Sequence, residues 1–168
     1  MARFCSFITL LLLSLSAIAQ TQNIIPQAEE YVNAMINKDF NVVVELTHPE
    51  IIKSGGGIGL AIQDLEKEQA MLDDQEIIYQ SGSVGKLGEI KQSENVIQTI
   101  LPIHIDVLVK GSEYVSNSHL LATSFDNGLS WSFVNMEKFD ANSLREFIPT
   151  LHPDLVIPLS LPYQRKDK

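Results

Sequence analysis

The segment IHIDVLV, from Ile103 to Val109, lies in the half of the chain that decides the fold. Branched aliphatic residues occupy every second position of this segment, from Ile103 onwards. Alternate residues of a strand point to opposite faces of a sheet, so this pattern predicts a strand with one apolar face. His104 and Asp106 occupy positions between the aliphatic residues. If the apolar face meets the helices, His104 and Asp106 point away from any enclosed pocket, as a solvated or dimer-facing pair.

Strand signals continue on both sides of this segment. Val, Ile, Thr and Tyr dominate from residue 73 onwards, and the turn-forming stretches GSVGKLG, KQSEN, VKGSEY and FDNGLSW interrupt them at short intervals. The expected strands lie near residues 76–84, 87–92, 95–109, 113–124 and 131–136. Short turns between consecutive strands favour an antiparallel meander.

Helical periodicity is confined to the first half of the chain. Apolar residues recur at helical spacing from Pro26 to Asn37, where proline suits the first turn of a helix. A second, short helix is expected from Phe40 to a point before Pro49, and a third over Ile58–Asp73. The glycines before this third helix lack the spacing of nucleotide-binding loops and predict a plain connection. Three helices followed by a meander predict an α+β domain with the helices packed on a curved antiparallel sheet.

The remaining segments complete a one-domain interpretation of the 168 residues. Residues 1–19 contain one basic residue, an apolar run and an Ala-Ile-Ala cleavage site, and this pattern predicts a secretory signal peptide. We expect cleavage after Ala19. The leader would span 20–25, the domain 26–160, with a short helix over Ala141–Phe147, and a fraying tail 161–168. The expected location is therefore secreted or periplasmic, with no transmembrane segment after cleavage.

Charge and composition restrict the partners of this domain. The formal net charge of −9 disfavours nucleic acids and anionic membrane surfaces, which need clustered Lys and Arg. The single cysteine, Cys5, would be removed with the signal peptide. The four histidines do not occur at metal-ligand spacing, so we expect no metal, and no cofactor motif is present. His48-Pro49 and His152-Pro153 are interpreted as turns that end helices.

The stretch TSFDNGLSW, Thr123 to Trp131, has the spelling of the Asp-box hairpin found in sialidase propellers. In such a hairpin the Asp126 carboxylate accepts hydrogen bonds from backbone amides, Gly128 provides a positive φ and Trp131 packs under the turn. None of these roles is catalytic. One copy in a chain too short for several four-stranded blades predicts a structural turn and not a carbohydrate hydrolase.

Three segments carry a resemblance to a known family. AEEYVNAMINKDFNVVVELTHP (28–49), LLATSFDNGLSWSFVNM (120–136) and PDLVIP (153–158) are similar to the nuclear transport factor two-like superfamily, also called ketosteroid isomerase-like or SnoaL-like, in a secreted bacterial branch. The resemblance covers residues 24 to 158. It implies a cone-shaped, cystatin-like domain whose sheet and long helix enclose an apolar pocket, often in a homodimer.

Isomerase members of this superfamily use a carboxylate base with a Tyr/Asp oxyanion pair, and this set has no residue-by-residue counterpart here. Tyr79 and Tyr114 lie on expected strands, but no carboxylate at a suggestive spacing accompanies them. The departure from the family pattern weakens the enzyme interpretation.

We therefore expect a non-catalytic domain that binds a small apolar ligand or a protein partner. Tyr31, Tyr79, His119 and Trp131 are the candidates for the lining of its pocket. An isomerase or dehydratase with Asp106 or His119 as base is the first alternative. A dimerisation or envelope-assembly module, with an apolar patch on the outer sheet face, is the second.

Overall fold

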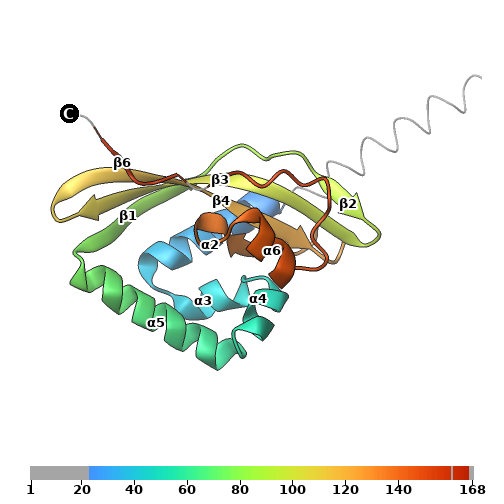
Figure 1. The fold of residues 1–168 in the computed structure, drawn as a ribbon, viewed down its shortest axis with the longest axis horizontal. Coiled ribbons are helices and arrows are strands. Elements are labelled where there is room, and N and C mark those ends of the chain that lie inside the picture. Colours follow the sequence, from blue (N-terminus) through green and yellow to red (C-terminus); the bar gives the residue numbers. More distant parts are fainter. Residues whose placement is uncertain (1–22, 160, 167–168) are drawn as a thin grey trace, which may run out of the picture.

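The computed structural model describes residues 23–159 and 161–166. These residues form an α+β structure with a strongly curved antiparallel sheet and several helices, of which α2 packs against one face of the sheet (Figure 1). We call the face against helix α2 the inner face and the opposite one the outer face. The expected signal peptide and residues 20–22 of the leader lie outside the described residues. Within the described residues, every helix is too short or too polar to cross a membrane.

Four helices precede the first strand in the described chain, where three were expected. They are α2 (Ile24–Asn37), α3 (Phe40–Glu45), α4 (Pro49–Ser54) and α5 (Ile58–Asp74). α2 begins two residues before Pro26, and it ends where Lys38 adopts a left-handed conformation with φ of 62°. α5 has no fully buried residue, so it packs less deeply than α2, which contributes five residues to the core.

The second helix ends before Pro49, as predicted, but His48-Pro49 also begins a further helix, α4, which was not expected. His48 is the N-cap of α4, its Nδ1 accepts a hydrogen bond from the Glu50 amide at 3.2 Å, and Pro49 occupies the first turn. Proline suits this position because its missing N–H would have no helical partner there. The glutamate in the first turn also interacts favourably with the helix dipole.

Six strands form one sheet in the order β1-β3-β4-β5, with β2 paired to β3 and β6 paired to β4. Their bounds are β1 Ile77–Val84, β2 Lys91–Ser93, β3 Val96–Val109, β4 Ser112–Ser124, β5 Ser132–Asn135 and β6 Gln164–Arg165. The strand expected over 87–92 is thus reduced to β2, because most of its residues form an irregular connection. The tail expected to fray instead contributes β6. A 3₁₀ turn (Met136–Lys138) and the expected helix, α6 (Ala141–Phe147), follow β5.

The alternation of β3 is confirmed as the basis of the core. Ile103, Ile105 and Val107 are at most 2% exposed and belong to the cluster that contains α2, whereas His104 is exposed on the outer face. The β3–β4 turn consists of Lys110 and Gly111, both with positive φ. Such a two-residue turn matches the twist of the paired strands.

A second apolar cluster includes residues of β4, β5 and α6 and of the chain after α6. Its buried members are Leu121, Val134, Met136, Leu144, Ile148, Leu151 and Leu155. Leu121 is paired with Ile100 in the strand register, and both contribute to this second cluster and not to that of α2. Both faces of the sheet therefore bury apolar side chains, and the chain after α6 runs along the sheet in Figure 1.

An irregularity in β1 places Tyr79 on the inner face. Tyr79 is paired with Val107 and Ser81 with Asp106, so Gln80 is an additional residue in β1. A bulge of this kind lets Tyr79 and Gly82 point to the same face although they are three residues apart. Gly82 lies so close to α2 that a Cβ atom would be 2.6 Å from Cγ1 of Val32. The bulge thereby determines which β1 side chains face the helices.

The TSFDNGLSW stretch forms the predicted hairpin between β4 and β5. The Asp126 carboxylate accepts hydrogen bonds from the amides of Leu129 and Ser130, at 2.9–3.1 Å, and from two serine hydroxyls. Gly128 has a φ of 89°, and Trp131 donates from Nε1 to the Gly128 carbonyl. The carboxylate is thus fully engaged in closing the turn.

Replacement of Asp126 by alanine is expected to lower the free energy of unfolding by about 1–3 kcal/mol, because several backbone and hydroxyl donors lose their acceptor. Chemical denaturation followed by tryptophan fluorescence measures this loss. The matched control is Asp154→Ala, which removes an exposed loop carboxylate and should change stability by less than about 0.5 kcal/mol. Equal effects of the two substitutions would contradict the structural role of Asp126.

Candidate functional site

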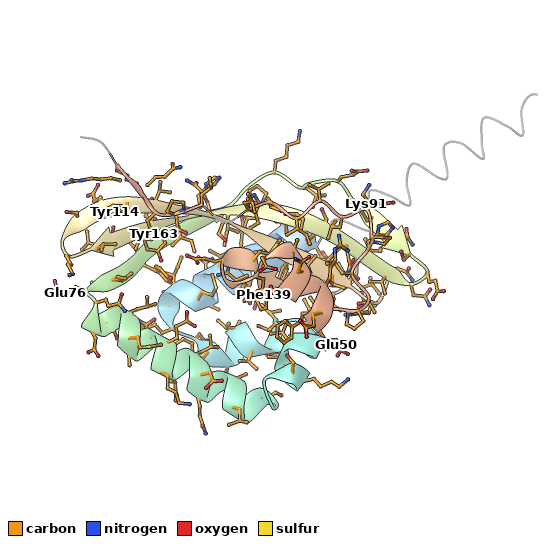
Figure 2. The ribbon with its side chains drawn as sticks, viewed as in Figure 1. Glu50, Glu76, Lys91, Tyr114, Phe139 and Tyr163 are labelled. Atoms are coloured by element: carbon orange, nitrogen blue, oxygen red, sulfur yellow. The ribbon has the colours of Figure 1, made fainter. Side chains whose placement is uncertain are left out.

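Two tyrosine hydroxyls meet on the inner face of the sheet. Tyr79 extends from β1 and Tyr163 from the segment before β6, and their hydroxyl oxygens are 3.5 Å apart. Both rings pack partly buried against the core cluster of α2. Figure 2 labels Tyr163 and Tyr114 near the end of the sheet where β6 is paired with β4. Residues 84 positions apart in sequence thus form one polar contact at the rim of the apolar core.

The carboxylates of Glu68 and Glu137 contribute to raised pKa values of both tyrosines. Burial, followed by the hydrogen bond to Tyr163 and the charges of Glu137 and Glu68, raises the pKa of Tyr79 strongly. Burial is also the main reason why the pKa of Tyr163 is raised, and Glu137 contributes a hydrogen bond and its charge. Both phenols therefore remain neutral hydrogen-bond donors throughout the physiological pH range. Glu68 comes from α5 and Glu137 from the 3₁₀ turn.

Tyr31, another expected site residue, lies deeper on the same side. It is 4% exposed, and its ring centroid is 5.5 Å from that of Phe133. Burial raises the pKa of Tyr31, and hydrogen bonds with Thr47 and with the Asn135 backbone oppose this effect. The Tyr31 side chain is therefore part of the core cluster of α2.

Several apolar side chains on the inner side pack against the same core cluster as the pair and are only partly buried. They come from α2, α5, β1 and β4, and they include Met35, Ile36, Leu65, Ile77 and Tyr114. α5 buries none of its residues fully, and its Leu65 packs partly buried against the core cluster. We call Tyr79, Tyr163, Glu68 and Glu137, with these apolar neighbours, the inner site. It combines apolar contact area with hydroxyl donors and carboxylate acceptors.

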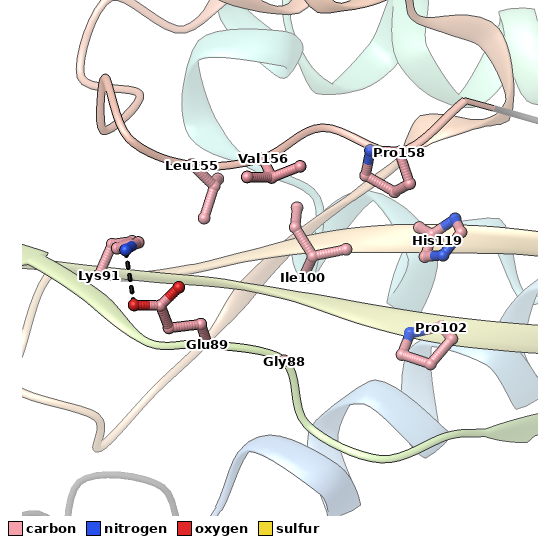
Figure 3. Close-up of a pocket in the computed structure, with 9 residues that line it drawn as sticks. All are labelled: Gly88, Glu89, Lys91, Ile100, Pro102, His119, Leu155, Val156 and Pro158. Atoms are coloured by element: carbon pink, nitrogen blue, oxygen red, sulfur yellow. Dashed lines mark hydrogen bonds and ion pairs between the residues drawn. The ribbon is translucent and has the colours of Figure 1, made fainter.

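The outer face carries a separate, open groove of about 280 Å³ (Figure 3). Its lining residues are Gly88, Glu89, Lys91, Ile100, Pro102, His119, Leu155, Val156 and Pro158. Glu89 and Lys91 form an ion pair of 2.6 Å at one end. Burial, followed by the charge of His104, lowers the pKa of His119. The groove is mostly apolar, with His119 and this ion pair as its polar groups.

Asp106 also lies on the outer face. Its carboxylate accepts a hydrogen bond from Ser81 at 2.9 Å and forms an ion pair with Lys166 at 2.6 Å. The hydrogen bonds from Lys166 and Ser81 lower the pKa of Asp106. Its neighbour on the same face, His104, is hydrogen-bonded to Asn117. Asp106 is therefore a charged anchor for the end of the chain.

The four expected pocket residues are thus divided between two faces and the core. The structure brings Tyr31 and Tyr79 to the inner side, places His119 in the outer groove, and buries Trp131 beneath the hairpin. Sequence reasoning did not include Tyr163, Glu68 and Glu137 in the site. The one available signal was Tyr163 itself, which is an isolated aromatic residue beside a basic tail.

Comparison with models of protein families, with curated proteins and with solved structures finds no significant match for this chain. In the ranges 23–159 and 161–166, no group of three or more His, Cys, Asp and Glu side chains could hold a metal ion. What the site can do therefore has to be argued from its own geometry.

Proposed function

We propose that this chain is an exported, non-catalytic domain that binds a small apolar ligand at the inner site, with a cone-shaped, cystatin-like architecture of the nuclear transport factor two-like kind. The observation that supports this proposal is the meeting of the Tyr79 and Tyr163 hydroxyls at 3.5 Å among partly buried apolar side chains. Ligand sites are typically apolar with a few well-placed polar groups. The neutral hydroxyls and the carboxylates would orient a ligand that carries a polar group on an apolar body.

A protein partner is the second candidate, and the outer face supports it. Val156 and Leu159 are 81% and 83% exposed, and Ile90 is 39% exposed. Val156 also lines the outer groove. Ile90 and Leu159 are chain neighbours of the groove residues Lys91 and Pro158, and exposed apolar residues of this kind are typical of interaction surfaces. A homodimer or an assembly module would use this face.

The isomerase alternative has less support than binding. Asp106 and His119 both lie on the outer face, and in the described chain neither is hydrogen-bonded to a tyrosine hydroxyl. Asp106 is engaged with Ser81 and Lys166, so its charge already has partners. A general base must reach the proton that it removes, and neither residue reaches the inner site.

Native mass spectrometry of the protein purified from its own host tests the proposal directly. A co-purified small molecule would support ligand binding, and a dimer or a bound protein would support the second candidate. A bare monomer would count against both.

Substitution of Leu65 by tryptophan is expected to weaken binding of the neutral fluorescent probe N-phenyl-1-naphthylamine about tenfold or more. Leu65 projects from α5 and packs partly buried against the inner core, so a larger side chain would fill the inner site. Tenfold corresponds to about 1.4 kcal/mol of binding free energy. Equilibrium fluorescence titration measures the affinity.

The matched control for this substitution is Val156→Trp, which adds the same side chain to the outer groove. It should leave the probe affinity unchanged if the probe binds at the inner site. A loss of affinity in Val156→Trp alone would assign the binding to the outer groove and contradict the proposal.

A further inference from the structure

The segment Leu161–Lys166, which we call the C-terminal strap, lies along an edge of β4. Within it, β6 is paired antiparallel to β4, with Arg165 opposite Tyr114 and Gln164 opposite Val115. The Lys166 amide continues the ladder by donating to the Glu113 carbonyl at 3.1 Å. β5 is paired with a different part of the same strand, residues 120–123, so the strap extends this edge of the sheet.

Alternation along the strap sends its side chains to both faces. Tyr163 points inward, where its hydroxyl meets that of Tyr79. Gln164 points outward and accepts a hydrogen bond from Asn117 Nδ2 at 3.3 Å. Lys166 also points outward and forms its ion pair with Asp106. One short segment thus couples an anchor on the outer face to a tyrosine of the inner site.

The attachment of the strap is light. Only two of its residues are paired as a strand, and every strap residue except Tyr163 is exposed. The side chains of Lys166 and Asp106 are 41% and 40% exposed, and an ion pair of this exposure contributes little free energy. Segments with few buried contacts open locally at much lower cost than the whole fold. The strap can therefore detach while the core remains folded.

Detachment of the strap would change the inner site in a defined way. Tyr163 is the strap residue that packs against the inner core, so its departure would uncover Tyr79 and the neighbouring apolar side chains. β1, β3 and the rest of β4 would keep their pairing, because the strap is paired as a strand only with Tyr114 and Val115 of β4.

We propose that the C-terminal strap is a releasable cover of the inner site, held closed by the Lys166–Asp106 pair on the outer face and opened to admit ligand. This inference rests on the proposed function. In it, Asp106 and Lys166 are positioning residues for Tyr163, and Tyr163 is a residue that contacts the ligand. High salt should favour opening, because exposed ion pairs are screened by salt.

Hydrogen exchange measured by mass spectrometry tests the release without any ligand. In the substitutions Asp106→Asn and Lys166→Gln, amides of the strap and of residues 113–116 should exchange about two- to fivefold faster than in the unaltered chain, the range expected for loss of an exposed pair. Lys67→Gln removes a comparable exposed pair, Lys67–Asp64, on α5, and should leave these amides unchanged.

Stopped-flow uptake of N-phenyl-1-naphthylamine gives the second measurement. Uptake should be about two- to fivefold faster in Asp106→Asn and Lys166→Gln, in proportion to their exchange rates. Unchanged exchange, or faster exchange with unchanged uptake, would overturn the strap as a cover while leaving ligand binding intact. Absence of probe binding in the unaltered chain would overturn the proposed function and the cover with it.

Discussion

Replacement of Trp131 by alanine is expected to lower the free energy of unfolding by about 3–5 kcal/mol, the range for truncating a large buried aromatic side chain. The indole is 3% exposed and packs in the core cluster of α2. Its Nε1 donates to the Gly128 carbonyl at 3.2 Å, and the Trp131 backbone amide donates to Gln27 Oε1 at 2.8 Å. The residue therefore joins the hairpin, the sheet and α2.

Urea unfolding monitored by far-UV circular dichroism measures this effect, because Trp131 is the only tryptophan and its removal abolishes the fluorescence signal. Trp131→Phe keeps most of the apolar volume and should cost less, about 1–2 kcal/mol. Leu129→Ala is the control within the same turn, since Leu129 is 72% exposed and should change stability by less than about 0.5 kcal/mol.

The outcome also decides between two roles of Trp131. If Trp131→Phe preserves stability but abolishes probe binding, the indole is a ligand contact, as the sequence suggested. If stability falls in the expected order and the affinity of the folded Phe variant is unchanged, the indole is a packing residue. Its burial beneath the hairpin favours the second outcome.

The sheet was predictable because its central strand is long and regular. β3 spans 14 residues, and its branched aliphatic side chains alternate over the part that faces α2. β2 was less predictable, since Lys91, Gln92 and Ser93 have little intrinsic preference for strands and are fixed by pairing with β3. β6 was missed for the same reason. Its two residues become a strand only through contact with β4.

α4 could have been found from local signals. Proline at the first helical position, followed by an acidic residue in the first turn, is a pattern typical of a helix start. The His48-Pro49-Glu50 sequence has this pattern, but it was interpreted through the restriction that proline places on the preceding residue. The restriction and the helix-start pattern are both satisfied here. His48 has an extended backbone, with ψ of 130°, and Pro49 begins the new helix.

The inner site could not be assembled from the sequence. The position of Tyr79 depends on the bulge at Gln80. In a regular strand, Tyr79 and Gly82 would point to opposite faces of the sheet. Tyr163 reaches the site through a strand pairing between distant segments, and Glu68 and Glu137 arrive from two further elements. Only the convergence of these elements in space brings tyrosines and carboxylates together.

The pH dependence of stability is expected to be dominated by His48 between about pH 6.5 and pH 4. His48 is fully buried, its Nδ1 accepts from the Glu50 amide, and its Nε2 has no hydrogen-bond partner among the described residues. Its ring is in edge contact with Phe125, at a centroid distance of 5.5 Å. Burial lowers the pKa of His48 from 6.5 to about 4, and the charge of Glu50 opposes this shift only in part.

The sign follows from comparing the folded and unfolded chains. Between pH 6.5 and pH 4 the unfolded chain binds a proton at residue 48 and the folded chain does not, so the free energy of unfolding falls as the pH is lowered. Above pH 6.5 this contribution to stability is fully present, and below pH 4 the loss is complete. At about 1.4 kcal/mol for each pH unit, the loss amounts to about 3 kcal/mol.

Denaturant unfolding at a series of pH values measures this loss, and two substitutions isolate its origin. His48→Asn keeps a residue that can cap α4 but cannot titrate, so most of the slope between pH 6.5 and 4 should disappear, leaving the part that the lowered pKa of His119 contributes. His152→Asn is the matched control, because His152 also accepts at Nδ1 from the amide two residues later, at 3.2 Å, but is only half-buried. It should retain the full slope. The lowered pKa values of Asp106 and Asp126 affect stability mainly below their ordinary pKa of 3.8, so these carboxylates contribute only a small part of the slope above pH 4. If the pH dependence of stability persists in His48→Asn and disappears in His152→Asn, the acid sensitivity arises from His152. That result would contradict the argument from the burial of His48.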